Sequence, residues 1–176
     1  IPGKDTIGIE IPNIEKELVT LGEVVAAVNR SQRKEILPVC MAKDVSGKPI
    51  VADLAKMPHL LIAGATGSGK SVCINSVILS FLMCCRPDEV KMILVDPKVV
   101  ELSRFKEIPH LLSPVITDMK RAVGVLEWAC QKMDERYEQL SMVSVNNIAK
   151  FNALGEEEIN KRLSDAYSED EMELFP

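Results

Sequence analysis

Residues 64–71 read Gly-Ala-Thr-Gly-Ser-Gly-Lys-Ser, which matches the P-loop pattern GxxxxGK(S/T). They follow a short apolar run, Leu60 to Ala63, and precede a longer apolar stretch, Ser71 to Cys85. A strand before the loop and a helix after it are the context in which this pattern binds phosphate groups. The motif therefore restricts the chain to folds in which a buried strand passes through a tight turn into a helix.

The residue types of the loop suit a nucleoside triphosphate. Its three glycines permit backbone angles that side chains forbid, so that successive N–H groups converge on one phosphate. We expect the Lys70 ammonium to act catalytically at the β- and γ-phosphates of ATP, and the Ser71 hydroxyl to bind Mg²⁺. The alternative is a glycine-rich turn with a solvated lysine, but a turn alone requires neither Lys nor Ser after its last glycine. The predicted ATP-binding residues are Gly64, Ala65, Thr66, Gly67, Ser68, Gly69, Lys70, Ser71 and Val72.

The composition favours an α/β fold. Hydrophobic residues make up 47% of the 176 residues and aromatic residues only 4%, so the core must be mainly aliphatic, which suits a sheet covered by helices. No stretch approaches the roughly 18 to 20 apolar residues of a membrane span, and the first residues lack the order of a signal peptide. The five cysteines include no CxxC pair, so we expect reduced core residues of a cytoplasmic protein.

The net charge of −5 is concentrated near one end of the chain. Residues 156–173 contain eight acidic and two basic residues, which leaves 18 acidic and 19 basic residues in the remainder. The larger part of the chain is thus nearly neutral, with neither a basic patch for DNA nor a strongly repellent surface. Charge by itself leaves nucleic acid binding undecided, and the sequence identifies no DNA-contacting residues.

Short patterns predict the elements before the loop. Residues 7–11 alternate as an edge strand would, and Thr20 and Glu23 have the spacing of a capping box that starts a short helix. Two apolar runs, 36–41 and 49–52, flank a turn at Ser46-Gly47 and predict a β-hairpin.

From the loop onward the pattern predicts a strand–helix–strand unit. Leu60 to Ala63 is the first strand, Ser71 to Cys85 a buried helix, and Val90 to Val95 a parallel strand buried on both faces. Thr117 or Asp118 then caps a long helix, and Asn147 to Leu154 forms a short one that ends at Gly155. The acidic residues after Gly155 predict a helix that frays. We expect the long helix to bury a stripe that consists of Ala122, Leu126, Ala129, Met133, Tyr137 and Leu140.

Read as strings, several stretches resemble the motor core of the FtsK/SpoIIIE family of bacterial DNA translocases. They are GKPIVADLAKMPHLLIAG at 47–64, leading into the P-loop, ILVDPK at 93–98 with Glu101-Leu102, IPHLLSPVITD at 108–118, and MDERY at 133–137. IPGKD at 1–5 and GIEIPN at 8–13 resemble the end of the smaller domain that precedes this motor. The resemblance covers about residues 1–155 in order.

This resemblance implies a RecA-like P-loop ATPase with a mostly parallel sheet flanked by helices. Members assemble as a ring, commonly a hexamer, around double-stranded DNA and move it with ATP and Mg²⁺ during chromosome segregation, cell division or sporulation. The family also implies a bacterial inner-membrane anchor, a cytoplasmic motor and contacts with other division proteins. It divides the chain into the end of a small α-type domain and a linker (1–35), the front half of the ATPase domain (36–155) and an acidic, mobile segment (156–176).

The family pattern places its catalytic Walker B strand, which ends in Asp-Glu, after the acidic segment. We therefore expect the 176 residues to form an incomplete sheet and to hydrolyse ATP weakly or not at all by themselves. Asp96 ends an apolar run beside the P-loop and could hold the water shell of Mg²⁺. It could also simply end a strand before Pro97. The roles of Asp96 and Lys98 remain open at this point.

Three other functions compete with DNA translocation. A secretion or conjugation ATPase of the same superfamily would move protein or single-stranded DNA, although the chain stays close to the translocases around its hairpin and its Pro-His-Leu-Leu stretches. A nucleotide-binding or assembly module without turnover fits the segment taken by itself. A small nucleotide kinase is disfavoured because no arginine-rich lid is present.

Overall fold

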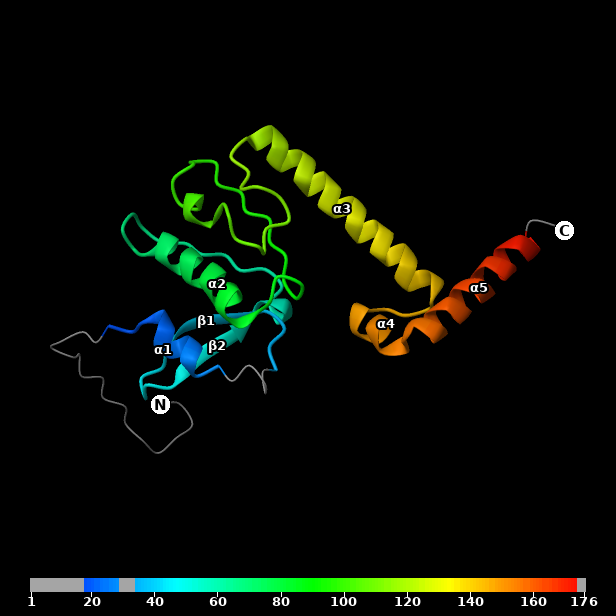
Figure 1. Ribbon diagram of the computed structural model, residues 1–176, viewed down its shortest axis with the longest axis horizontal. Helices are drawn as coiled ribbons and strands as arrows, with labels where there is room; N and C mark the ends of the chain where they lie inside the picture. Colours follow the sequence, from blue (N-terminus) through cyan, green and yellow to red (C-terminus); the bar gives the residue numbers. More distant parts are fainter. Residues whose placement is uncertain (1–17, 29–33, 174–176) are drawn as a thin grey trace, which may run out of the picture. The chain divides into compact units, whose positions relative to one another are not determined.

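The computed structural model of the chain describes residues 18–28 and 34–173. They form two compact units that divide between Val115 and Ile116 (Figure 1). The strand predicted at residues 7–11 lies outside the described residues, as do residues 1–17 and 29–33 of the predicted small domain and linker (1–35). The helices and strands are α1 (Leu21–Ala26), β1 (Pro38–Lys43), β2 (Pro49–Asp53), α2 (Lys70–Cys84), α3 (Met119–Met142), α4 (Ile148–Leu154) and α5 (Glu156–Glu173), with 3-10 helices at Leu54–Lys56 and Ser103–Phe105.

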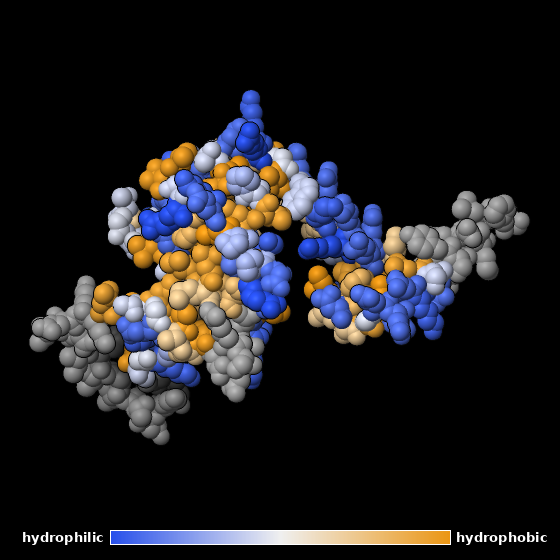
Figure 2. Space-filling view, in the orientation of Figure 1, coloured by the Kyte–Doolittle hydropathy of each residue, from blue (hydrophilic) through white to orange (hydrophobic). Residues whose placement is uncertain are grey.

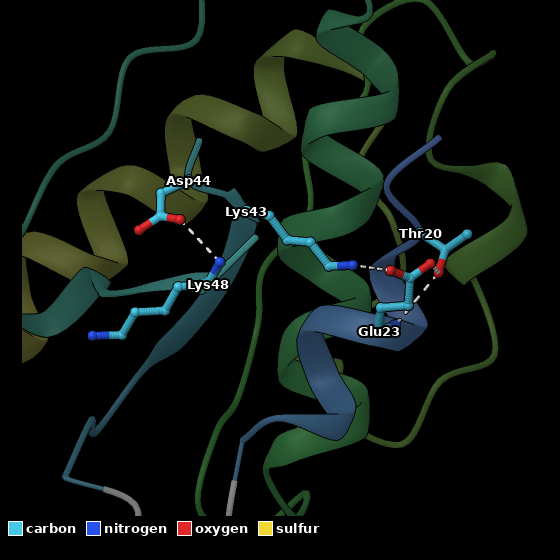
Figure 3. A network of polar contacts seen from close by, with 5 residues as sticks. All are labelled: Thr20, Glu23, Lys43, Asp44 and Lys48. Atoms are coloured by element: carbon cyan, nitrogen blue, oxygen red, sulfur yellow. Dashed lines mark hydrogen bonds and ion pairs between the residues drawn. The ribbon is translucent and has the colours of Figure 1, made fainter. Parts of the chain in front are cut away.

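The predicted hairpin is confirmed. Strands β1 and β2 pair antiparallel, and the turn between them contains Gly47 at a φ of +80°, a conformation that favours glycine. The Asp44 carboxylate accepts hydrogen bonds from the backbone N–H groups of Ser46 (2.8 Å) and Lys48 (2.9 Å), and so closes the turn. Figure 3 shows the second of these bonds.

The predicted capping box is also confirmed. The hydroxyl of Thr20 accepts a hydrogen bond from the backbone N–H of Glu23 at the start of α1. The Glu23 carboxylate is held in turn by the Lys43 ammonium of β1 (Figure 3). The hydrogen bond from Lys43, with a further one from Thr20, lowers the pKa of Glu23. Helix α1 is thereby tied to the hairpin by an ionic contact as well as by packing.

Helices α1 and α2 pack against the hairpin and form the core of the first unit. A bulge in β1 lies between Cys40 and Ala42, and the buried N–H of Cys40 donates to the Ser80 hydroxyl of α2 over 3.1 Å. Ser80 is fully buried and donates its own proton to the backbone carbonyl of Ser76. A buried amide near the bulge is satisfied in this way. The core residues are Val24, Val39, Cys40, Ile78, Phe81, Cys84, Cys85, Val90, Met92, Leu94, Leu102 and Phe105.

The parallel strands predicted around the P-loop are not formed in the described part of the chain. Residues 60–63 have no strand partner, and the run 90–95 makes one isolated parallel bridge, from Met92 to Leu111. The burial of this run also differs from the prediction, because Val90, Met92 and Leu94 are buried while Val95 is exposed. Only one face of the run is covered, so its burial alternates as in a one-sided strand.

Residues 60–63 and 90–95 do not pair as strands; an open apolar groove is lined by residues of both runs. Residues 58–60 and 62 line it together with residues 92–94. Ile74, Ile78 and Phe81 of α2 also line it. Apolar side chains accordingly reach the surface of the first unit over α2 (Figure 2). The chain contains both helices and strands, as the expected α/β class requires. The expected mostly parallel sheet is not seen, because the one regular sheet in the described residues has two antiparallel strands.

In the second unit, the cap of α3 is Asp118, one of the two predicted candidates, which accepts a hydrogen bond from the N–H of Lys120. The predicted buried stripe of α3 is wrong, because only Ala122 is buried and Leu126, Met133 and Tyr137 are exposed. The stripe has the right spacing, but packing partners decide whether such a face is covered. Helix α4 ends at Gly155, as expected, and the acidic stretch after it forms α5.

Helix α5 is joined to the end of α3 by one arginine. Arg162 donates to the backbone carbonyl of Val143 over 3.0 Å and to the Glu158 carboxylate over 2.7 Å. These bonds fix the turn after α3, where Val143 is fully buried. The hydrogen bond from Arg162 lowers the pKa of Glu158. Among the described helices, none combines the length and apolar character needed to cross a bilayer.

Asp53 at the end of β2 yields a stability prediction. Its buried carboxylate accepts hydrogen bonds from the N–H groups of Ile36 (3.2 Å), Leu37 (2.9 Å) and Ala55 (3.2 Å). Replacement of Asp53 by alanine leaves these donors without the carboxylate, and we expect the free energy of unfolding to fall by about 2–4 kcal/mol. Asp53→Asn keeps one acceptor oxygen and should lose about half as much. Chemical denaturation at pH 7 measures both values.

The same residue predicts a pH dependence. Burial by itself raises the pKa of Asp53, but the backbone hydrogen bonds from Leu37, Ile36 and Ala55 outweigh it, and the pKa lies below its ordinary value. The stabilisation is therefore complete above the pKa of an unfolded aspartate, about 3.9, and disappears as the pH falls through the lower pKa of the folded protein. As the pH is lowered from about 5 through the pKa of folded Asp53, the free energy of unfolding should fall more for the wild type than for Asp53→Asn. Equal losses in the two proteins would contradict this.

Candidate nucleotide-binding site

The P-loop leads directly into helix α2. Gly67 and Gly69 have φ angles of +78° and +91°, and Gly69 is the residue that precedes the helix. No side chain caps this end, so the N–H groups of the first turn point outward without an intrahelical partner. Free amides and the positive end of the helix dipole together favour an anion at this position.

The first glycine of the loop, Gly64, lies close to the side chain of Ser68. A Cβ atom at Gly64 would lie 2.4 Å from the hydroxyl oxygen of Ser68 and 3.2 Å from its Cβ. A side chain at position 64 would therefore require the Ser68 side chain to move. The loop itself is closed by a hydrogen bond from the N–H of Ser68 to the carbonyl of Ala65, at 3.1 Å.

Lys70 folds back over the loop. Its ammonium donates to the backbone carbonyls of Gly64 (2.8 Å) and Ala65 (2.9 Å). An ammonium group has three donors, so these two bonds leave one for a further acceptor. The structure therefore places a positive charge at the start of the loop. The end of the same loop, where α2 begins, presents free backbone N–H groups.

Ser71 makes the second polar contact of the site. Its hydroxyl donates to the carboxylate of Glu101 over 2.6 Å, from the first turn of α2 to a residue 30 positions further along the chain. Sequence reasoning did not single out Glu101 as a site residue, since no local pattern relates it to the loop. Only its position shortly after the ILVDPK stretch could have drawn attention to it.

Asp96 lies behind this contact. Its side chain is 5% exposed and accepts hydrogen bonds from the N–H groups of Leu102 (2.9 Å), Glu101 (3.0 Å) and Lys98 (3.3 Å). The bond from Leu102, assisted by those from Glu101 and Lys98, lowers the pKa of Asp96, so the carboxylate stays ionised at neutral pH. In the structure Asp96 organises the turn that carries Glu101, and the side chain of Lys98 is exposed.

The remaining predicted residues are accessible. Ala65, Thr66 and Ser68 are exposed in the loop, and Val72 is 68% exposed in the first turn of α2. Of the sequence-predicted residues, the structure brings Lys70 onto the start of the loop and connects Ser71 to Asp96 through Glu101. No group of three or more His, Cys, Asp or Glu side chains within the described ranges is arranged to hold a metal ion.

The cysteines agree with the prediction in part. Cys40, Cys84 and Cys85 are buried and Cys73 is half-buried, whereas Cys130 on α3 is exposed. None of the five, all of which lie in the described ranges, forms a disulfide bond. His110, also buried, has one ring nitrogen 3.0 Å from the carbonyl oxygen of Cys85, at the end of α2 opposite to the loop. The prediction of core cysteines is therefore confirmed for Cys40, Cys84 and Cys85, whereas Cys73 is outside the core and Cys130 lies at the surface.

Comparison with known proteins agrees with the resemblance seen in the sequence. The sequence model of the FtsK/SpoIIIE family matches residues 20–168. The chain is 53% identical over 152 residues to DNA translocase FtsK of Haemophilus influenzae, covering 86% of the chain and 29% of that protein. It is 54% identical over 157 residues to the Pasteurella multocida protein of the same name (89% and 17%). For the Pseudomonas aeruginosa protein of that name, the identity is 48% over 152 residues (86% and 19%).

The chain spans less than a third of the length of these relatives. The family match covers most of the chain and includes the P-loop, Asp96 and Glu101. The chain therefore belongs to the FtsK/SpoIIIE family, and through it to the P-loop NTPases.

Proposed function

We propose that the protein containing this chain is an ATP-driven translocase of double-stranded DNA, and that residues 64–72 bind its ATP. The observation that supports this most strongly is the P-loop itself. Its two left-handed glycines lead into an uncapped helix, and Lys70 lies across its start. About half the residues are identical to those of proteins named DNA translocase FtsK.

Each part of the loop has a distinct task in this proposal. The N–H groups at the start of α2 bind the phosphates, and the Lys70 ammonium moves from the carbonyls of Gly64 and Ala65 onto the β- and γ-phosphate oxygens. The Ser71 hydroxyl oxygen is a ligand of the type that Mg²⁺ prefers, and the ion needs only one or two protein oxygens beside phosphate and water. When bound, Mg²⁺ neutralises charge that develops on the phosphates during hydrolysis.

Assembly and location are proposed from the family resemblance. Copies of the protein form a ring, most simply a hexamer, around duplex DNA, and the motor lies in the cytoplasm of a bacterium, anchored at the inner membrane with other division proteins. Within the chain, residues 36–155 form the front half of the ATPase domain, residues 1–35 are the end of a preceding small domain and a linker, and residues 156–176 are an acidic segment. For the segment by itself we propose nucleotide binding with little hydrolysis, because both carboxylate oxygens of Asp96 and one of Glu101 already accept hydrogen bonds within the protein.

ATP hydrolysis by the full-length protein, with and without DNA, tests this function. We expect linear duplex DNA to raise the rate of ATP hydrolysis about tenfold or more, because duplex DNA is the substrate on which this motor acts. Single-stranded DNA should have little effect, and displacement of a third strand from a triplex should report movement along the duplex. Stimulation by single-stranded DNA alone would favour a conjugation ATPase instead. An absence of stimulation by any DNA would refute the proposal.

A further inference from the structure

The contact between Ser71 and Glu101 gives the serine oxygen a fixed orientation. Ser71 has one hydroxyl proton, and the 2.6 Å bond directs it to the carboxylate oxygen of Glu101. The lone pairs of the Ser71 oxygen therefore point away from Glu101. An oxygen that can rotate freely binds a cation less well than one whose lone pairs are already oriented.

Glu101 is itself held by the backbone. Its N–H donates to Asp96 over 3.0 Å, and the N–H of the next residue, Leu102, donates to the same carboxylate oxygen over 2.9 Å. Leu102 is buried in the core of the first unit. The hydrogen bonds to Asp96 and the buried Leu102 thus fix the backbone of Glu101. The Glu101 side chain is half-buried and contacts Ser71 of α2.

We propose that Glu101 is a positioning residue of the magnesium site of this P-loop, an inference that rests on the nucleotide binding proposed above. Its carboxylate holds the Ser71 hydroxyl so that the serine oxygen faces Mg²⁺. The negative charge also lies one hydrogen bond from the oxygen that contacts the ion, which strengthens cation binding. Without the ion, the same charge opposes the approach of the phosphates.

Asp96 takes an indirect part in this arrangement. Its carboxylate oxygens bind backbone amides, so it contributes by keeping Glu101 in place rather than through a free oxygen. A direct role of Asp96 as a metal ligand, suggested by its place after the apolar run, stays a prediction. If Asp96 only keeps Glu101 in place, its effect on Mg²⁺ binding requires the Glu101 side chain. If Asp96 is a direct ligand, its effect on Mg²⁺ binding does not.

The test measures how much Mg²⁺ improves nucleotide binding. A fluorescent, non-hydrolysable ATP analogue is titrated into the full-length protein, once with Mg²⁺ and once with excess EDTA. In the Glu101→Ala variant we expect the gain in affinity from Mg²⁺ to shrink about tenfold, as for other residues that orient metal ligands. The affinity in EDTA should be unchanged or higher, because a repulsive charge is removed. Glu101→Gln keeps an acceptor oxygen, so its gain in affinity from Mg²⁺ should lie between those of the wild type and Glu101→Ala.

Glu107→Ala is the matched control, since Glu107 is an exposed glutamate in the same stretch whose ion pair with Lys106 spans 3.8 Å at the surface. It should behave as the wild type. An unchanged gain from Mg²⁺ in Glu101→Ala would overturn the inference and leave the proposed function standing. Equal losses in Mg²⁺ and EDTA would also overturn it, because they would indicate a structural role alone. A wild type that binds no analogue in either buffer would refute both proposals.

Discussion

Replacing Lys70 by alanine is expected to weaken binding of the magnesium–ATP complex about 30- to 100-fold, the value of one charge-assisted hydrogen-bonding group. ATP hydrolysis by the full-length protein should fall further, by about 100- to 1,000-fold, because the ammonium also stabilises charge in the transition state. The bonds that Lys70 makes in the structure are to Gly64 and Ala65, two exposed loop residues. The thermal stability should therefore change little. Calorimetric titration, steady-state hydrolysis and a melting curve measure the three effects.

Lys106→Ala provides the control for lost positive charge. Lys106 is an exposed lysine of the same unit, and its side chain is 70% accessible. Its removal should leave both affinity and hydrolysis at the wild-type level. If Lys70→Ala bound and hydrolysed ATP as well as Lys106→Ala, the loop would not be the phosphate site.

Gly69→Ala should reduce nucleotide affinity about tenfold. Gly69 has a φ of +91°, and this angle costs an L-residue roughly 1–2 kcal/mol, although a Cβ atom here would meet no other atom within 4 Å. The substitution is thus unfavourable for conformational reasons alone. If alanine adopts a negative φ in the unliganded protein, phosphate binding must restore the positive φ, and the cost then appears as lost affinity. Calorimetric titration with Mg²⁺ and an ATP analogue measures the loss.

Gly124→Ala is the control for this substitution. Gly124 lies inside α3 and has an ordinary φ, and a Cβ atom added to it would likewise meet nothing within 4 Å. Alanine should leave binding unchanged and stabilise α3 by up to about 1 kcal/mol, since it favours a helix more than glycine. If Gly69→Ala bound nucleotide normally and melted at the wild-type temperature, the left-handed turn would have no part in binding.

Local patterns predicted local structure well. The Thr20 capping box, the Ser46-Gly47 turn and the Asp118 cap each involve residues within a few positions of one another, so the sequence contains both partners of each hydrogen bond. The P-loop belongs to the same class, because its glycines and Lys70 act within eight residues. For these features, the chemistry of a short stretch is enough to determine its conformation.

Features that depend on distant partners were predicted less well. The run 90–95 has the composition of a strand buried on both faces, but the described fold covers only the side of Val90, Met92 and Leu94. The stripe of α3 has helical spacing, yet spacing cannot show whether another element covers it. Glu101 was missed for the same reason, because its contact with Ser71 joins positions 30 residues apart.

A structure of the full-length protein with Mg²⁺ and a non-hydrolysable ATP analogue shows whether residues 64–72 bind the triphosphate. We predict that the β-phosphate lies within hydrogen-bonding distance of backbone N–H groups at the start of α2. The Lys70 ammonium should have left the carbonyls of Gly64 and Ala65 for the phosphate oxygens. A nucleotide bound elsewhere, or a Lys70 side chain that keeps both carbonyl contacts with the analogue present, would show that this loop does not bind the phosphates as proposed.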